Sequence, residues 1–512
     1  MNWRGLTLTG AAVLAIAAAL WHLVGAASGL TISRASVGST PVTIFAAADP
    51  APAPVVVIAH GFAGSQQLMQ SFALALARNG YIALTFDFLG HGRNTEPLRG
   101  SITEEQGATK ALVEELAEVG AFARRLPQSD GRLAVLGHSM ASDIVVRYAQ
   151  AHPEVEATVA VSMFAPGITA TSPRNLLVVV GALEPAPLRD EAYRAVAMAS
   201  DGKPQPDVTY GDFGKGTARR MVFSPSVEHI SVLYSRASLA AAVAWLDAAF
   251  SRDRAEVKGV GLANARGLYI VLLFLGLTLL ARSVAPLLPQ AAASPLGAGL
   301  PWRRLLPAAI LPALLTPLIL WKLPTNFLPV LVGDYLAAHF ALYGFLTALA
   351  LLVLGRGIKP PQDVTSSYGK LAIATIAVAF YGVVIFGLAI DLFVTSFVPV
   401  SGRVVLVLAM LAGTLPYFLA DEWLTRGATA PRGAYLVTKL CFLLSLGIAV
   451  VLNPEKLFFL IIILPVILLF FVIYGLFSAW SYRSTNDPRV AALANAIALA
   501  WAIAVTFPLL AR

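Results

Sequence analysis

One short segment of the chain could carry a catalytic nucleophile. Gly137, His138, Ser139, Met140 and Ala141 follow an apolar run and precede residues with helical spacing. A sharp strand-to-helix turn needs small residues two positions before and two positions after the serine, and Gly137 and Ala141 meet that need. Such a turn would lift the Ser139 hydroxyl above a sheet, at the amino end of a helix where negative charge is favoured.

A serine hydroxyl needs a general base to act as a nucleophile at neutral pH. His229 follows the last predicted strand and is the candidate base, and Glu184, just past the preceding strand, is the candidate group that orients its imidazole. The chain order of serine, acid and histidine is the order that this layout requires. Asp190 and Glu228 are the alternative acids.

A glycine-rich turn at 60–64 follows an earlier predicted strand. Such a turn can aim a backbone N–H at the oxyanion that develops when a carbonyl carbon is attacked. The expected donors are the backbone N–H groups of Phe62 and Met140. We interpret the side chain of His60 as a buried imidazole that braces its own loop.

The surrounding residues predict the elements that would position these groups. Short apolar strands are expected at 54–59, 81–86, 132–136, 157–163, 176–180 and 220–223, and helices at 66–79, 103–126, 140–151 and 239–250. Apolar strands alternating with helices predict an α/β fold, a doubly wound, mostly parallel sheet covered on both faces. Chemistry in such sheets lies at the carboxyl ends of the strands.

Five motifs in this order resemble those of the α/β-hydrolase family: HGFAG at 60–64, FDFLGHGRN at 86–94, GHSMA at 137–141, GALEP at 181–185 and EHIS at 228–231. The resemblance covers residues 31–250. It implies that Ser139 is the nucleophile, His229 the base and Glu184 the acid, and that Asp87 and His91 form a structural turn. Two residues depart from the family pattern, because Ala141 replaces a glycine and Glu184 stands where aspartate is commoner.

The composition of the whole chain indicates a membrane protein. Of 512 residues, 57% are hydrophobic and 13% charged, against about 25% charged in a typical soluble domain. The mean hydropathy is +0.72. This composition excludes a soluble cytoplasmic enzyme, a disordered chain and a nucleic-acid-binding protein as descriptions of the whole chain. We expect no metal and no cofactor, because the sequence has no zinc or iron–sulfur spacing and one cysteine, Cys441.

Nine apolar stretches are long enough to cross a bilayer, which takes about 20 residues. The first, Leu6–Ala27, is interpreted as an uncleaved anchor, with a cleaved signal peptide as the alternative. The others lie at 267–286, 305–321, 327–355, 370–394, 403–422, 433–452, 456–480 and 490–510. The expected domains are therefore a transmembrane anchor at 1–30, an extracytoplasmic α/β-hydrolase domain at 31–258, and a transmembrane helical bundle of eight spans at 259–512.

The loop charges favour one orientation, because lysine and arginine gather in cytoplasmic loops. With the amino end in the cytoplasm, the inside loops carry Arg282, Arg303, Arg304, Arg356, Lys359, Lys370, Arg426, Arg432, Arg483 and Arg489. The short outside loops carry Lys322, Arg403 and Lys456. We therefore expect a multi-pass protein of the cytoplasmic (inner) membrane of a bacterium, with the α/β domain on the periplasmic side and the net charge of +8 explained by cytoplasmic loops.

Ionisable residues inside the expected spans are further candidates for function, because such groups are costly in hydrocarbon unless they pair or line a cavity. Asp334 and His339 lie in one span, and they point in neighbouring directions on a helix. For this pair, a structural role and a substrate path are equally favoured.

The leading hypothesis is a membrane-anchored extracytoplasmic serine esterase that acts through an acyl-serine intermediate. Its expected partners are the lipid bilayer and a small-molecule or lipid ester, with no nucleic acid. The alternatives are an acyltransferase that acts on an envelope lipid or glycan, and a transporter or sensor with a hydrolase-like ligand-binding domain.

Overall fold

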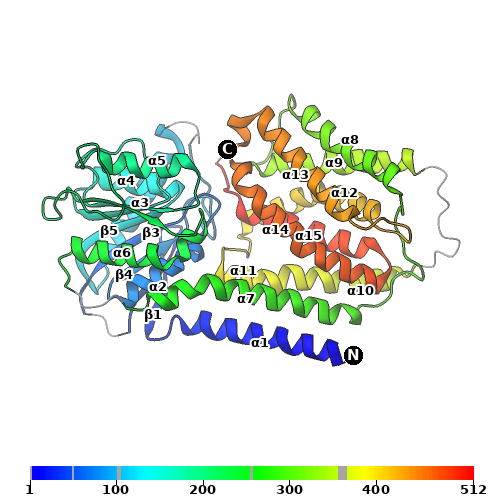
Figure 1. Ribbon diagram of the computed structural model, residues 1–512, viewed down its shortest axis with the longest axis horizontal. Coiled ribbons are helices and arrows are strands. Elements are labelled where there is room, and N and C mark those ends of the chain that lie inside the picture. The colour runs from blue at the N-terminus through cyan, green and yellow to red at the C-terminus, as the bar shows by residue number, and fades with distance from the viewer. Residues whose placement is uncertain (1–2, 49–50, 101–104, 254–257, 356–365, 512) are drawn as a thin grey trace. The chain divides into compact units, whose positions relative to one another are not determined.

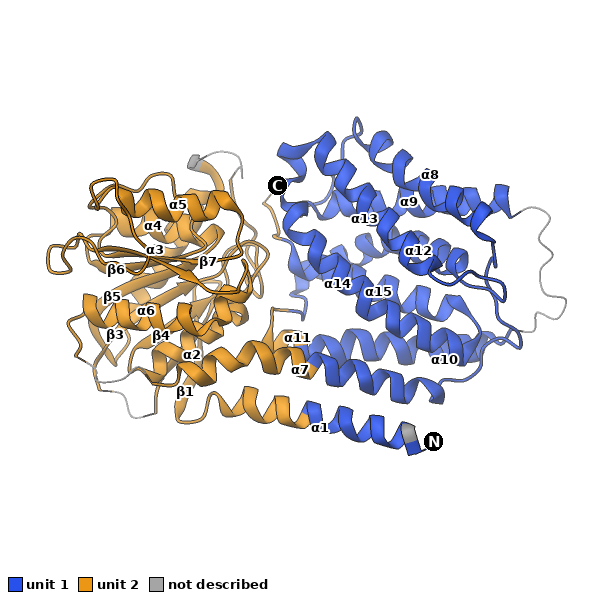
Figure 2. Ribbon diagram, viewed as in Figure 1, with its two compact units in different colours: residues 1–16, 274–389, 397–507 blue, residues 17–273, 390–396, 508–512 orange. Residues whose placement is uncertain are grey.

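The computed structural model describes residues 3–48, 51–100, 105–253, 258–355 and 366–511. Two compact units make up the chain (Figure 2). Unit 1 comprises residues 1–16, 274–389 and 397–507, and unit 2 comprises residues 17–273, 390–396 and 508–512. Arg356 and Lys359, two of the expected cytoplasmic charges, and Thr103, the expected start of a helix, lie outside the described residues.

Unit 2 contains one eight-stranded sheet in the order β1-β2-β4-β3-β5-β6-β7-β8 (Figure 1). The first two pairings, β1 with β2 and β2 with β4, are antiparallel and the remaining five are parallel. The predicted α/β class is therefore confirmed. The strands are β1 (Leu30–Val37), β2 (Thr40–Ala47), β3 (Ala53–Ala59), β4 (Ile82–Phe86), β5 (Ser129–His138), β6 (Val155–Val161), β7 (Leu176–Gly181) and β8 (Arg219–Ser224).

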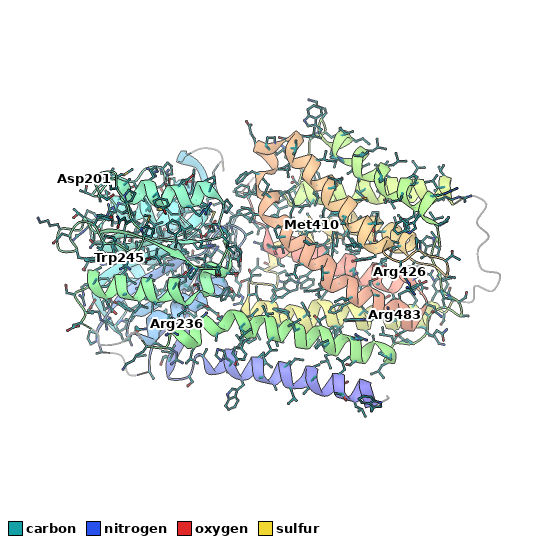
Figure 3. The ribbon with its side chains drawn as sticks, in the orientation of Figure 1. Asp201, Arg236, Trp245, Met410, Arg426 and Arg483 are labelled. Atoms are coloured by element: carbon teal, nitrogen blue, oxygen red, sulfur yellow. The ribbon has the colours of Figure 1, made fainter. Side chains whose placement is uncertain are left out.

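Helices cover both faces of this sheet because its inner strands β3 and β7 are apolar and buried along their whole length. In β3, Val56 packs in one cluster with α2 (Gln70–Arg78) and α6 (Arg236–Ala249), while Val55 and Val57 pack on the other face with α3 (Lys110–Arg124) and α4 (Met140–Ala151). Trp245, which Figure 3 labels, belongs to α6. Its indole N–H donates to the carbonyl of Asn175, at 2.8 Å. Two-sided burial is the arrangement that continuous apolar strands indicate.

Several elements differ from the sequence-based expectation. The helix expected at 103–126 is broken at Gly107, whose φ of −92° and ψ of −121° are not helical, so a π-turn, η2 (Glu105–Thr109), precedes α3. The helix expected at 66–79 begins as a 3-10 turn, η1 (Gln66–Met69), before α2. The antiparallel hairpin of β1 and β2 and the helix α5 (Ala186–Ala197) were not predicted.

Nine helices or helix combinations in the described residues are long and apolar enough to cross a membrane. The stretch at 327–355 contains one helix, α9 (Gly333–Leu354), as expected. The other spans are formed by α1 (Trp3–Gly25), α7 with η4 (Val260–Leu287), α8 (Trp302–Leu320), α10, η5 and α11 (Tyr368–Phe393), η6 with α12 (Ser401–Thr425), α13 (Ala434–Leu452), α14 (Pro454–Thr485) and α15 (Pro488–Thr506). A short 3-10 turn, η3 (Ser231–Tyr234), lies in unit 2.

Small residues let the helices of unit 1 approach closely. A Cβ added at Gly413 of α12 would collide with the carbonyl of Ala337 in α9, and one at Gly344 of α9 would collide with the backbone of Tyr417 in α12. Met410 of α12 is fully buried (Figure 3). This is the close packing that small residues permit between membrane helices.

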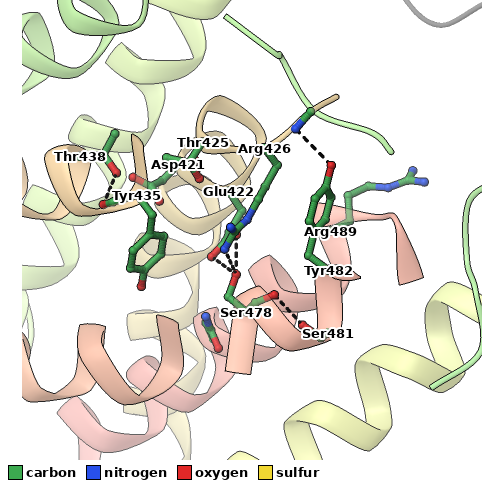
Figure 4. Close-up of polar contacts among 12 residues, drawn as sticks. Asp421, Glu422, Thr425, Arg426, Tyr435, Thr438, Ser478, Ser481, Tyr482 and Arg489 are labelled. Atoms are coloured by element: carbon green, nitrogen blue, oxygen red, sulfur yellow. Dashed lines mark hydrogen bonds and ion pairs between the residues drawn. The ribbon is translucent and has the colours of Figure 1, made fainter. Parts of the chain in front are cut away.

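Two buried carboxylates of unit 1 have cationic partners. The carboxylate of Glu422 accepts from Ser478 at 2.6 and 2.7 Å and from Arg426 at 3.2 Å (Figure 4). Asp421, one residue earlier, forms an ion pair with Lys439 of α13. These pairs join α12 to α13 and α14 and satisfy charges that would be costly in hydrocarbon if they were left alone.

Candidate active site

Ser139 lies at the sharp turn between β5 and α4. Its φ of +56° and ψ of −121° are unusual for a residue with a side chain. Ser142 holds the turn, because its N–H and hydroxyl both donate to the carbonyl of Ser139, at 2.8 and 2.5 Å. A Cβ added at Gly137 would collide with the carbonyl of Ala141. This steric limit is the reason the turn requires a small residue at position 137.

Of the three residues predicted as a triad, His229 lies within hydrogen-bond distance of both Ser139 and Glu184. Nε2 of His229 lies 2.9 Å from Oγ of Ser139, and Nδ1 of His229 lies 2.8 Å from Oε2 of Glu184. An ionised carboxylate only accepts hydrogen bonds, so Nδ1 carries the ring proton and Nε2 is free to accept the serine proton. The arrangement has the geometry of a nucleophile, a base and an orienting acid.

The carboxylate of Glu184 is held ionised by its surroundings. Its side chain is 0% exposed. Burial alone would raise the pKa of this carboxyl group, but hydrogen bonds from His229, from the N–H of Gly181 and from the hydroxyl of Ser162 together hold the pKa below its usual value. The last two bonds both end on Oε1, at 2.8 and 2.7 Å, and leave Oε2 for the imidazole.

Two residues that support the triad were missed in the sequence. His138 donates from Nε2 to the carbonyl of His229 at 2.9 Å, and burial lowers the pKa of His138 to about 3, so the ring is neutral. Ser162, at the end of β6, has a φ of +54° and donates to Glu184. His138 was part of the motif at 137–141, but no local pattern distinguishes Ser162 from other serines.

The turn at 60–64 packs directly against the nucleophile. A Cβ added at Gly61 would lie 3.0 Å from Cβ of Ser139 and 3.1 Å from the carbonyl oxygen of His138. Phe62 is the next residue, and Met140 opens α4 immediately after Ser139. The two backbone groups predicted as oxyanion donors therefore belong to residues next to Ser139 or next to Gly61, which packs against it.

His60 braces this turn. Its Nδ1 donates to the carbonyl of Gly61 at 2.8 Å and its Nε2 accepts from the N–H of Phe88 at 3.2 Å. Burial is the main cause that lowers the pKa of His60, and the ring is neutral. Nδ1 is thus used inside the turn, as we interpreted from the sequence, and Nε2 joins the turn to the loop that follows β4.

The remaining acidic candidates have other roles or positions. Asp87 accepts from the N–H groups of Gln66 and Arg93, at 2.8 and 2.9 Å, and forms a structural turn. Glu228 is exposed and accepts from the N–H groups of residues 230 and 231. Asp190 is exposed on α5. The carboxylate that contacts the imidazole of His229 is that of Glu184.

Asp334 and His339 belong to unit 1 and have local partners. Asp334, in the first turn of α9, accepts from the N–H of Tyr335 at 2.8 Å. His339 lies 3.1 Å from Oγ of Ser445 and 3.3 Å from the hydroxyl of Tyr335. Among the residues that the structure describes, no group of three or more histidine, cysteine or acidic side chains could hold a metal ion.

One family model matches the chain: residues 50–185 match the model described as serine aminopeptidase, S33. The match includes β3 to β7, Ser139 and Glu184, and ends before His229. No curated protein sequence matches the chain.

Solved structures of hydrolases are similar to less than half of the chain. A predicted CIB-like hydrolase from Thermoplasma acidophilum is 16% identical, with 44% of this chain and 98% of that chain covered and a TM-score of 0.32. A putative dienelactone hydrolase from Klebsiella pneumoniae is 17% identical, with 44% and 99% covered and a TM-score of 0.31. E-2-(acetamidomethylene)succinate hydrolase is 13% identical, with 43% and 100% covered and a TM-score of 0.31.

Proposed function

Because residues 50–185 belong to an α/β-hydrolase domain, we propose that the chain is a membrane-anchored serine hydrolase that cleaves carboxylic esters. The observation that carries the proposal is the continuous path from Glu184 through His229 to Oγ of Ser139, with two hydrogen bonds of 2.8 and 2.9 Å. This path would make a hydroxyl nucleophilic at neutral pH.

The reaction would proceed in two steps. Oγ of Ser139 attacks the ester carbonyl carbon while Nε2 of His229 accepts the hydroxyl proton, and the N–H groups of Phe62 and Met140 stabilise the oxyanion. The intermediate collapses to acyl-Ser139, and His229 returns the proton to the departing alcohol. Water, activated by His229, then attacks the acyl carbon and releases the acid and the free serine.

Exposed apolar side chains on the segments that carry the triad support a lipophilic ester as the substrate. Leu183 precedes Glu184 and is 67% exposed, and Ile230 follows His229 and is 43% exposed. Phe164, after β6, is 62% exposed, and its N–H donates to the hydroxyl of Ser142 at 3.1 Å. Exposed apolar side chains grouped at a site favour a ligand with an apolar body.

We also propose that unit 2 lies on the non-cytoplasmic side of the membrane. The expected threading of the spans requires residues 390–396 and 508–512 to emerge on the side of the α/β domain. Both segments belong to unit 2 together with the sheet. This grouping supports the number and threading of the spans, and the loop charges favour the non-cytoplasmic side for the unit.

The substrate class is tested with p-nitrophenyl esters of increasing acyl length, on the full-length protein in detergent. We expect hydrolysis that increases from acetate to longer chains in the wild type, and a weaker dependence on chain length in Leu183→Ser. Val208→Ser, which changes an apolar residue of the exposed loop before β8, is the matched control. If Leu183→Ser and Val208→Ser both keep the chain-length preference of the wild type, the lipophilic class is contradicted. Product analysis with an added alcohol distinguishes hydrolysis from acyl transfer.

A further inference from the structure

A segment far along the chain belongs to the same compact unit as the active-site sheet. Residues Ile390–Ser396 lie about three hundred residues after the turn at 60–64, yet they are part of unit 2 (Figure 2). The segment is folded, because the N–H groups of Val394 and Thr395 both donate to the carbonyl of Ile390, at 2.8 and 3.0 Å. We call it the strut segment.

The strut segment hydrogen-bonds to the residues that follow the turn at 60–64. The hydroxyl of Ser65 accepts from the N–H of Ser396 at 3.0 Å and lies 3.0 Å from the hydroxyl of Thr395. The amide of Gln67 donates to the carbonyl of Asp391 at 3.0 Å and to the hydroxyl of Ser396 at 3.1 Å. Ser65, Gln67 and Ser396 are at most 3% exposed. Buried hydrogen bonds of this kind are costly to break.

An ion pair joins the strut segment to the neighbouring loop. Nη2 of Arg93 lies 2.7 Å from Oδ2 of Asp391, whose side chain is 7% exposed. The N–H of Arg93 donates to Asp87, which also accepts from the N–H of Gln66. Through Arg93, Asp391 is therefore linked to Asp87, which holds Gln66 at the start of η1. Removing one partner of a buried pair leaves the other charge uncompensated.

The turn that this network supports is conformationally strained. Ala63 has a φ of +54°, in the left-handed region that residues with a Cβ rarely adopt. The N–H of Gly64 donates to the carbonyl of Gly61 at 3.1 Å, and Gly61 packs against Ser139. A strained residue persists when its surroundings hold it in place. Ser65 and Gln67, two and four residues after Ala63, are held by the strut segment.

We propose that the strut segment is part of the active site's support: Asp391 and Ser396 are positioning residues that hold the turn at 60–64 so that the N–H of Phe62 faces the reacting carbonyl. This inference rests on the proposed hydrolase function. Loss of one oxyanion donor lowers kcat by about 10²–10³-fold. A displaced donor would therefore lower kcat, because the oxyanion forms only in the transition state, and would leave KM nearly unchanged.

The test compares Asp391→Asn and Ser396→Ala in the full-length protein, with p-nitrophenyl butyrate as the substrate. We expect kcat to fall at least about tenfold with KM within about twofold of wild type. The unfolding temperature should fall below that of Asp207→Asn, a control that removes an ion pair with Arg220 in which the Asp207 side chain is 65% exposed, because the bonds of the strut segment are buried. A purely structural role would lower the unfolding temperature without this split between kcat and KM.

Fluorophosphonate labelling separates failure of this inference from failure of the proposed function. In one outcome, the wild type is labelled at Ser139, and both variants are labelled and either turn over at wild-type rates or change only in KM. This outcome overturns the role of the strut segment and leaves the hydrolase proposal standing. A folded wild type that does not label overturns the hydrolase and the strut together. Ser396→Ala, which removes only side-chain hydrogen bonds, decides the question if Asp391→Asn does not fold.

Discussion

Oε2 of Glu184 lies 2.8 Å from Nδ1 of His229, although the two residues are 45 positions apart in the chain. They meet because β7 and β8 are neighbours in the sheet and the two residues follow these strands. The other oxygen of Glu184 is occupied by Gly181 and Ser162. The carboxylate is thereby fixed with one oxygen aimed at the imidazole.

Glu184→Gln should remove the orienting charge and keep the shape of the side chain. Its amide can hold the imidazole in the wrong tautomer, so we expect kcat for p-nitrophenyl butyrate to fall by about 10³–10⁴-fold. Asp190→Asn, a change to an exposed carboxylate on α5, is the control and should stay within about twofold of wild type. Equal losses in the two variants would exclude Glu184 as the acid.

Gly137→Ala should disrupt the turn that carries Ser139. The new Cβ would collide with the carbonyl of Ala141 and lie 2.8 Å from Cγ2 of Val145. We expect a loss of about 1–3 kcal/mol in stability and loss of activity in the protein that still folds. The control is Gly167→Ala, where the nearest atom, Oε1 of Gln150, is 4.0 Å away. Thermal unfolding and turnover of both variants check this, and wild-type values for Gly137→Ala would contradict it.

Glu115 should make stability depend on pH. Burial raises the pKa of this carboxyl group from 4.5 to about 7, in spite of hydrogen bonds from Thr40, Leu89 and Asn94. The folded protein therefore keeps a proton that the unfolded chain loses, so stability falls as the pH rises from about 4.5 through about 7, by up to about 3 kcal/mol.

The measurement is the unfolding temperature of Glu115→Gln minus that of wild type across this pH range. The difference should increase with pH, because the variant has no proton to lose at this position. A pH-independent difference for Glu115→Gln would mean that the buried carboxyl does not titrate in this range.

The orientation of the chain can be tested with single cysteines, since Cys441 is the one native cysteine. In a Cys441→Ser background, Asp201→Cys on an exposed loop of unit 2 should react with a membrane-impermeant maleimide in intact cells whose outer barrier is open (Figure 3). Arg483→Cys, near the end of α14, should react only after the inner membrane is permeabilised. The reverse pattern would place the hydrolase domain in the cytoplasm.

The sequence predicted those parts of the candidate site that depend on residues close together in the chain. The small residues at 137 and 141 and the apolar run before them predicted the turn at Ser139, and α4 begins and ends at the expected residues. The family resemblance is confirmed for residues 50–185. The mostly parallel sheet was also predicted, because continuous apolar strands indicate burial on both faces.

Other features were not predictable because their cause is not local. β1 is largely exposed, and its apolar alternation of Leu30 and Ile32 stops at Arg34, which is too short to mark a strand. The pairing of Arg93 with Asp391 joins residues 298 positions apart, and hydrophobic periodicity carries no information on such contacts. The break at Gly107 was not predicted because residues 103–106 are all polar, so no apolar spacing marks where the regular helix begins.

The most direct test of the triad is fluorophosphonate labelling of the purified full-length protein, wild type beside Ser139→Ala and His229→Ala. We predict that the wild type is labelled on Ser139, that Ser139→Ala is not labelled, and that His229→Ala is labelled far more slowly, because the hydroxyl loses its base. A folded wild type that is not labelled, or a Ser139→Ala variant that is labelled as fast as wild type, would contradict a serine hydrolase built on Ser139, His229 and Glu184.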